Sequence, residues 1–162
     1  MITTERVKVE DVPEVKQLLS ETWIDTYGSF LSSETIQKVT STWHDPKSLA
    51  EQAQNPDIFF ALAKNEGRKV GLITISKIDK DTLMMNRLYV HPNFQRQGIG
   101  SKLVEQALKV FPNAKKMRLE VEEENRKGFA FYLKQGFKEV ERKQEKVEGE
   151  TMNVIVMEKD LA

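Results

Sequence analysis

Apolar positions in the first third of the chain predict one short strand followed by helices. Apolar and polar residues alternate from Arg6 to Glu10, as in a half-buried strand. Asp11 and Glu14 then stand three residues apart, which is typical of a capping box, and apolar residues follow at helical spacing. The serines at 32–33 can cap a second helix, and a third short helix begins at the Asp-Pro pair 45–46.

Beyond residue 57 the pattern becomes that of strands joined by tight turns. We predict a meander of three strands over residues 58–63, 70–78 and 83–90. A helix to about residue 111, a strand over 117–121, a helix ended by Gly136 and a hairpin over 137–158 follow. The charged tract 139–150 within the hairpin indicates a solvated face. This order predicts a mixed α/β fold, with a mostly antiparallel central sheet and flanking helices.

Composition narrows the class of protein. A chain of 162 residues has the usual size of one domain, so we expect a single domain over 1–162. The 25 Lys and Arg residues balance 25 Asp and Glu residues, which argues against a nucleic-acid or membrane-surface partner. The absence of cysteine removes disulfides, thiolate metal sites and Cys nucleophiles, and we expect no bound metal. Neither a signal peptide nor a long apolar run is visible, so we expect a cytoplasmic location.

A glycine-containing loop between a predicted strand and a predicted helix is a candidate anion-binding site. Its sequence, Gln-Arg-Gln-Gly-Ile-Gly-Ser-Lys over 95–102, matches neither the dinucleotide fingerprint nor the P-loop. Gly98 and Gly100 let backbone N–H groups approach a ligand closely, and the positive end of the helix dipole points to the same place. Arg96 and Lys102 add positive charge.

A second motif follows downstream, from Asn125 to Phe137, and includes Tyr132. Together with the glycine loop, the strand ending in Tyr89-Val90 and the strand ending at Val121, it resembles the GNAT superfamily of acetyl-coenzyme A-dependent N-acetyltransferases. The resemblance covers about residues 57–140 by motif and the whole chain by order of elements. The sequence departs from the family at Gly128, where Ala is usual.

The resemblance implies acetyl-coenzyme A as co-substrate and assigns roles to these residues. The loop N–H groups would hold the pyrophosphate, and the splayed strand end at 88–90 would pair with pantetheine and polarise the thioester carbonyl. Tyr132 would protonate the departing thiolate, although taken alone it also fits a core position beside Phe129. The implied cofactor-binding residues are Leu88, Tyr89, Val90, Gln95, Arg96, Gln97, Gly98, Ile99, Gly100, Ser101, Asn125 and Tyr132.

The general base is less well defined by the sequence. Asn86 occupies the position where many relatives place an acid, and an amide can hold a water molecule but cannot accept the proton. Glu120, Glu122 and His91 remain as candidates. We select Glu120 as the catalytic carboxylate because its side chain leaves the apolar face of its strand, while a solvated strand carboxylate is an equally good interpretation. We interpret His91 as an exposed turn residue.

The segment 22–27, after the first helix, is a candidate wall of the acceptor pocket. Trp23 and Tyr27 would surround an amine, with Asp25 and Asn86 in the same pocket, or the aromatic rings would simply pack in the core. The segment resembles a bacterial branch that includes polyamine acetyltransferases. We therefore expect a small-molecule amine as partner: first a polyamine such as spermidine, then a peptide or protein amine, then another small amine.

Two rival functions stay open at this point. A non-catalytic acyl-coenzyme A sensor or interaction domain on the same fold is compatible with Asn86 in place of an acid. A nucleic-acid binder is disfavoured by the zero net charge. A homodimer is compatible with the sequence, and we expect neither nucleic acid nor membrane among the partners.

Overall fold

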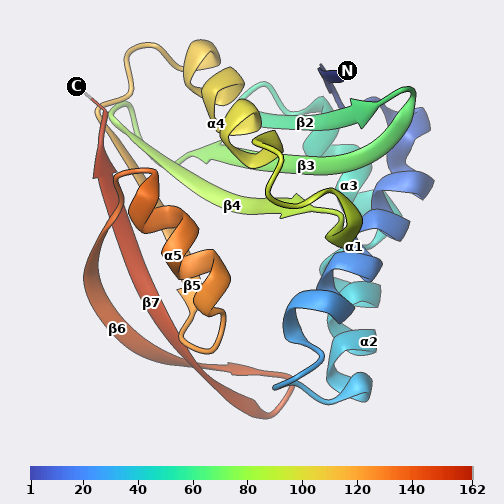
Figure 1. The fold of residues 1–162 in the computed structure, drawn as a ribbon, viewed down its shortest axis with the longest axis vertical. Helices are drawn as coiled ribbons and strands as arrows, with labels where there is room; N and C mark the ends of the chain where they lie inside the picture. The colour runs from blue at the N-terminus through green and yellow to red at the C-terminus, as the bar shows by residue number, and fades with distance from the viewer. Residues whose placement is uncertain (162) are drawn as a thin grey trace.

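The computed structural model describes residues 1–161 and contains one seven-stranded sheet with helices on both faces (Figure 1). The strands are β1 (Ile2–Arg6), β2 (Ile58–Asn65), β3 (Arg68–Lys77), β4 (Thr82–Val90), β5 (Lys116–Glu122), β6 (Lys138–Val147) and β7 (Glu150–Asp160). The helices are α1 (Val12–Tyr27), α2 (Ser33–Thr42), α3 (Pro46–Gln54), α4 (Ile99–Val110) and α5 (Arg126–Lys134), with 3-10 turns η1 (Val9–Asp11) and η2 (Pro92–Phe94).

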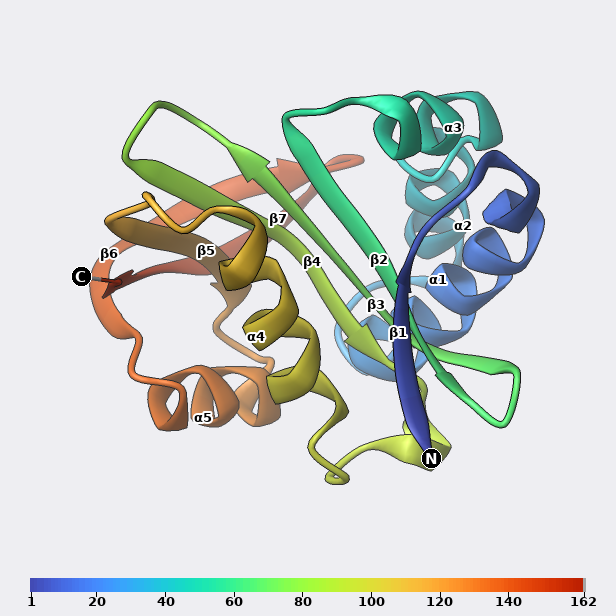
Figure 2. The ribbon, with the colours of Figure 1, turned by 90° about the horizontal axis from the view of Figure 1, so that it is seen from above.

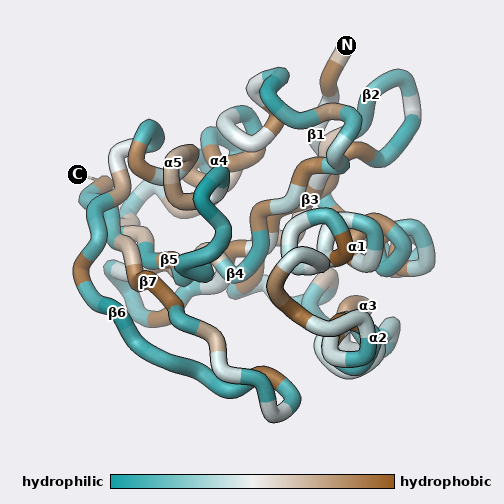
Figure 3. The backbone as a smooth tube through the Cα atoms, turned by 60° about the horizontal axis from the view of Figure 1, so that its bottom comes forward, coloured by the Kyte–Doolittle hydropathy of each residue, from teal (hydrophilic) through white to brown (hydrophobic). Residues whose placement is uncertain are grey.

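The strand order is β1-β2-β3-β4-β5-β7-β6, and all neighbours are antiparallel except β4 and β5. Helices α4 and α5 cover one face of the sheet, and α1 to α3 lie on the other (Figure 2). This arrangement confirms the predicted mixed α/β fold. Strand β6 forms one edge of the sheet and is mostly polar and exposed, as predicted for the charged tract (Figure 3).

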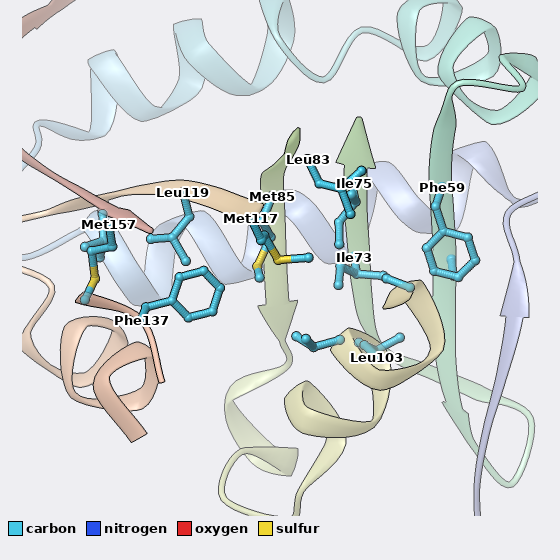
Figure 4. Packing of buried hydrophobic residues seen from close by; sticks show 14 of the residues in the cluster. Phe59, Ile73, Ile75, Leu83, Met85, Leu103, Met117, Leu119, Phe137 and Met157 are labelled. Carbon is cyan, nitrogen blue, oxygen red and sulfur yellow. The ribbon is translucent and has the colours of Figure 1, made fainter. Parts of the chain in front are cut away.

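The core is divided between the two faces of the sheet. Under α4 and α5, Leu103 and Phe137 pack against apolar side chains from the central strands, among them Ile73, Met85 and Leu119 (Figure 4). A second cluster packs α1 and α3 against β2 and β3, and a third joins the ends of α1 and α2 to the β6–β7 hairpin. The sheet is therefore fixed from both sides, except where its two parallel strands separate.

Strands β4 and β5 are paired over only part of their length. The parallel ladder ends at Met85 and Leu119, although β4 continues to Val90 and β5 to Glu122. At the same point the register between β3 and β4 shifts and Asn86 is left out of the ladder. Beyond it the two strands diverge (Figure 1), as the family resemblance implied.

The first strand lies earlier than predicted. The structure places β1 at Ile2–Arg6, and the predicted strand at 6–10 is wrong. The Lys8 N–H donates to the Asp11 carboxylate at 2.8 Å, which ends the extended chain and forms η1. That carboxylate also lies 3.5 Å from Lys69 Nζ and makes no capping bond to α1, so the predicted capping box is wrong as well. Five alternating residues are too few to distinguish a strand from a turn.

The other helix starts follow their predicted caps. Ser32 accepts from the Thr35 N–H, and Asp45 accepts from the Ser48 N–H. Helix α1 is longer than predicted, because the segment 22–27 forms its last turns instead of following it. Among residues 1–161, no helix combines the length and apolar composition needed to cross a membrane.

Candidate active site

A cleft of about 1690 Å³ opens where β4 and β5 diverge. It is lined by the loop before α4, the end of β4, the end of β5, helix α5 and the C-terminal turns of α1. All three tyrosines of the chain line it, namely Tyr27, Tyr89 and Tyr132. Of the residues that the sequence analysis assigned to catalysis, the coenzyme or the acceptor, only Gln97 is not part of its wall.

The loop at one end of the cleft depends on two residues in the left-handed backbone region. Arg96 has a φ of 64° and Gly98 a φ of 77°. Gly98 directly precedes α4, so the N–H groups of the first turn, from Ile99 onward, have no partner within the helix. No acidic side chain lies in that turn. The loop therefore offers several backbone donors and a positive dipole end to an anion in the cleft.

Side-chain hydrogen bonds hold this loop in place. Gln95 Nε2 donates to the Val90 carbonyl at 3.0 Å, and Ser101 Oγ accepts from Gln135 Nε2 at 3.0 Å. Lys102, expected to add charge to the loop, donates instead to the Ile2 carbonyl at 2.6 Å. The positive character of the loop thus comes from its backbone and from the exposed Arg96.

Close packing explains the second glycine of the loop. A Cβ atom at Gly100 would lie 3.1 Å from the Phe131 ring, so the absence of a side chain lets α4 approach α5. Asn125 caps α5 by accepting from the Gly128 N–H at 3.0 Å. A Cβ at Gly128 would lie 2.6 Å from the Asn125 amide nitrogen, which accounts for glycine at a position where the family usually has Ala.

The end of β4 presents free main-chain groups to the cleft. The His91 N–H donates to the Val70 carbonyl of the β3 side, and main-chain directions alternate along a strand. The N–H and C=O groups of Leu88 and Val90 therefore point away from β3, toward the side where β5 no longer pairs. Of these groups, the Val90 C=O already accepts from Gln95 Nε2. An extended ligand with amide groups can form strand-like hydrogen bonds there.

Glu122 is the acidic residue of the cleft whose proton affinity is most changed. Burial raises its pKa from 4.5 to about 7, against the hydrogen bond from Tyr27 that lowers it, and Glu124 and Glu145 raise it further. Glu120, two residues earlier, is exposed, and its carboxylate lies 2.9 Å from Lys143 Nζ. Both residues line the cleft, but only Glu122 is desolvated within it.

The tyrosine hydroxyls of the cleft remain protonated. Burial raises the pKa of Tyr132 above its usual value, and nearby Tyr89 and Glu122 raise it further. Burial raises the pKa of Tyr27 and of Tyr89 in the same way. The Tyr89 hydroxyl also accepts from Trp23 Nε1 at 3.1 Å. The cleft thus combines a carboxyl group near neutrality with phenols that can only donate protons.

Aromatic rings from the end of α1 form another wall. Trp23 and Tyr27 are one helical turn apart, and their ring centroids are separated by 4.2 Å. Both are buried in the third core cluster and also line the cleft. Asp25 and Asn86 are exposed at its margin, where Asn86 Oδ1 accepts from Ser76 Oγ at 2.8 Å.

His91 is not the exposed turn residue that the sequence indicated. Its side chain is only 13% exposed, because Nε2 lies 3.0 Å from the Glu21 carboxylate and Nδ1 accepts from the Asn93 N–H. The imidazole thereby links the end of β4 to α1 and is not part of the cleft wall. The interpretation failed because Glu21 is distant in sequence.

Sequence reasoning missed a group of polar residues on the α3 side of the cleft, namely His44, Gln52, Thr74 and Arg87. The one available signal was Arg87, a cation within the otherwise apolar strand end 87–90.

Comparison with known proteins agrees with the geometry. Residues 13–137 match the model of the acetyltransferase (GNAT) family. A spermidine N(1)-acetyltransferase of Thermoplasma acidophilum is 30% identical over 143 residues, which covers 85% of this chain and 88% of that protein. An uncharacterised N-acetyltransferase of Lactobacillus delbrueckii is 27% identical over 107 residues, 62% of each chain.

Solved structures show the same fold. The crystal structure of the PaiA N-acetyltransferase of Thermoplasma acidophilum in complex with coenzyme A has a TM-score of 0.87 and 26% identity, with 99% of each chain covered. A GCN5-related N-acetyltransferase of Rhodopseudomonas palustris has a TM-score of 0.80 and 20% identity, over 98% of this chain and 95% of that one. The class is thus that of coenzyme A-dependent acyl transfer enzymes. The chain belongs to the GNAT family, as an N-acetyltransferase that uses acetyl-coenzyme A.

Proposed function

We propose that the protein acetylates a primary amine by direct attack of the amine on the thioester, with Glu122 as general base and Tyr132 as general acid. A new N–C bond forms and the C–S bond breaks. Glu122 removes a proton from the substrate ammonium, so that the free amine can attack, and Tyr132 gives a proton to the departing thiolate. The supporting observation is that a carboxyl group of pKa about 7 and a half-buried, protonated phenol share one cleft.

The choice of Glu122 over Glu120 follows from their surroundings. A base must be ionised at working pH yet bind a proton readily, which favours a pKa near neutrality. Glu122 has this property because it is desolvated. Glu120, the base selected from the sequence, is occupied by an exposed ion pair with Lys143.

The coenzyme fits the remaining features of the cleft. We assign its pyrophosphate to the backbone donors of the loop 95–101 and its pantetheine arm to the free edge of β4 at 88–90. When bound, it supplies the activated acetyl group. An N–H of this edge would polarise the thioester carbonyl. Asn125 caps α5, so we assign it a positioning role for the helix that carries Tyr132.

A polyamine is the first acceptor to test. One relative is named a spermidine N(1)-acetyltransferase. In this chain, carboxylates from α1, β5, the turn after β5 and β6 line the same cleft as the Trp23 and Tyr27 rings, which suits an ammonium group. They are Asp25, Glu120, Glu122, Glu124 and Glu145.

The test is a panel of amines incubated with acetyl-coenzyme A and the purified protein. The panel includes spermidine, putrescine, butylamine, 5-aminovalerate and a lysine-containing peptide, with thiol release and the mass of the acetylated amine as readouts. We expect protein-dependent acetylation of at least one amine. If the protein binds acetyl-coenzyme A but acetylates none of these amines, the result supports a non-catalytic acyl-coenzyme A-binding role and contradicts the proposed function.

A further inference from the structure

Arg87 is a half-buried cation that lacks an anionic partner. Its Nη1 donates to Gln52 Oε1 at 2.7 Å and to Thr74 Oγ1 at 3.2 Å, both neutral acceptors. The guanidinium lies 5.8 Å from the centre of the Phe60 ring, and burial lowers its pKa. Among residues 1–161, no carboxylate forms an ion pair with it, and no hydrogen bond uses its Nε or Nη2. An unpaired charge that is partly removed from water is costly, so its presence calls for a functional reason.

A second unpartnered group lies in the same part of the cleft. His44 is 2% exposed, and its Nδ1 has no hydrogen-bond partner within the described chain. Burial, together with the positive charges of Arg87 and Lys16, lowers the pKa of His44 to about 3, so the imidazole is neutral. Lys16 Nζ donates only to the carbonyls of Thr40 and His44. The surroundings of Arg87 are therefore positively charged, and no carboxylate within residues 1–161 accepts from its guanidinium.

The Arg87 end is distinct from the glycine loop. Phe60, beneath the guanidinium, belongs to the core cluster on the α1–α3 face, whereas Ile99 of the loop belongs to the cluster under α4 and α5. Arg87 and Glu122 both line the cleft, and both act on Tyr89, whose pKa Glu122 raises and Arg87 lowers. The cleft thus contains a cation, Arg87, as well as the carboxyl group of Glu122.

We propose that Arg87 forms a carboxylate-binding subsite, and that the acceptor is a primary amine that also carries a carboxylate. This inference rests on the proposed acetyl transfer. The planar guanidinium offers two parallel donors to a carboxylate, because its Nε and Nη2 make no other hydrogen bond among residues 1–161. The amine of such an acceptor lies toward Glu122. A polyamine would instead bring positive charge against Arg87.

The test uses pairs of acceptors that differ only in the anionic group. Unbranched ω-amino acids from glycine to 5-aminovalerate are compared with their primary amides and with spermidine, and kcat/KM is measured for each. We expect at least one acid to exceed its amide and spermidine by roughly tenfold or more. Arg87→Gln should reduce the acid-to-amide ratio roughly tenfold to hundredfold. Lys47→Gln, which removes an exposed cation from α3, is the matched control and should leave the ratio unchanged.

Binding measured by calorimetry with coenzyme A present separates the two proposals. Selective binding of an acid that depends on Arg87, without turnover of any amine, supports the subsite and contradicts the proposed function. Acids and amides that bind and react equally, a ratio unaffected by Arg87→Gln, or a preference for spermidine would overturn the subsite. Arg87→Gln should also unfold at the wild-type temperature or above it, because it removes an unpaired, half-buried charge. A marked loss of thermal stability would assign Arg87 a structural role.

Discussion

Desolvation acts on two side chains of the cleft with opposite consequences for chemistry. It raises the pKa of the Glu122 carboxyl to about 7, where both protonation states are accessible. It raises the pKa of the Tyr132 phenol further from neutrality, so that this group keeps its proton. One group is thereby suited to accept a proton and the other to donate one.

Burial of Glu122 should also make stability depend on pH. Its pKa is about 7 in the folded protein, against 4.5 for the free side chain, so the unfolded chain ionises first as pH rises. The folded state then loses stability between these two values and not below them. Glu122→Gln should therefore stabilise the protein by about 3 kcal/mol at alkaline pH and have little effect near pH 4.

Urea unfolding at the two pH values checks this expectation. Glu120→Gln is the control, because its exposed ion pair contributes at most about 1 kcal/mol at either pH. A stabilisation by Glu122→Gln that is equal at both pH values would contradict the raised pKa.

Replacing Tyr132 by Phe isolates the hydroxyl group. The ring contacts with Phe131 and Phe137, at centroid distances of 5.4 and 5.8 Å, would be kept. We expect the acetylation rate to decrease roughly a hundredfold, with acetyl-coenzyme A affinity unchanged within about twofold. Steady-state kinetics and calorimetric titration measure the two quantities. A fully active variant would return Tyr132 to a packing role.

The sequence could locate the residues of the cleft but not their environments. Glu120 and Glu122 lie two apart on one strand and so point to the same face, and alternation cannot distinguish them. Their difference arises because the surrounding elements desolvate Glu122, whereas Glu120 is exposed and pairs with Lys143 of β6. The environments of Arg87 and His91 could not be predicted for the same reason, since their partners are distant in sequence.

At the scale of elements, the glycine loop should bind the coenzyme through its shape. Gly98 has a φ of 77°, and a Cβ there would meet nothing within 4 Å, so the space beside it is open to a ligand. Gly98→Ala strains the backbone by about 1 kcal/mol and fills that space. We expect the Kd for acetyl-coenzyme A to rise roughly tenfold or more, as measured by calorimetry.

Gly67 provides a matched control in the β2–β3 turn. Its φ is 84°, and a Cβ there also meets nothing within 4 Å, but it lies outside the cleft. Gly67→Ala should therefore carry the same backbone strain and leave the Kd unchanged. Equal affinities for the two variants would remove the phosphate role of the loop.

Most elements were predictable because their hydrophobic patterns are long or are bounded by clear turn and capping residues. The three strands of the meander, the helix ended by Gly136 and the final hairpin all appear, with ends shifted by a few residues. The errors occur where the pattern is short, as at 6–10, or where a helix continues through polar residues, as at 22–27. There, tertiary contacts decide the outcome.

At the scale of the whole molecule, the divergence of β4 and β5 creates the site. It separates β4, whose main-chain groups we assign to the coenzyme, from the strand that carries Glu122. Helix α5 brings Tyr132 to the cleft, and α1 brings the aromatic wall. The proposed chemistry therefore needs elements from the entire chain, which explains why a local motif indicated the coenzyme but not the base.

The most direct test of the proposed chemistry is the pH dependence of kcat/KM for Glu122→Gln and Glu120→Gln, with the best amine of the panel. For the wild type we expect a rise centred near the Glu122 pKa of about 7. Glu122→Gln should lose that rise and roughly a hundredfold to ten-thousandfold in rate, while Glu120→Gln keeps the rise. A Glu122→Gln enzyme with the wild-type rate and profile would contradict the assignment of the base.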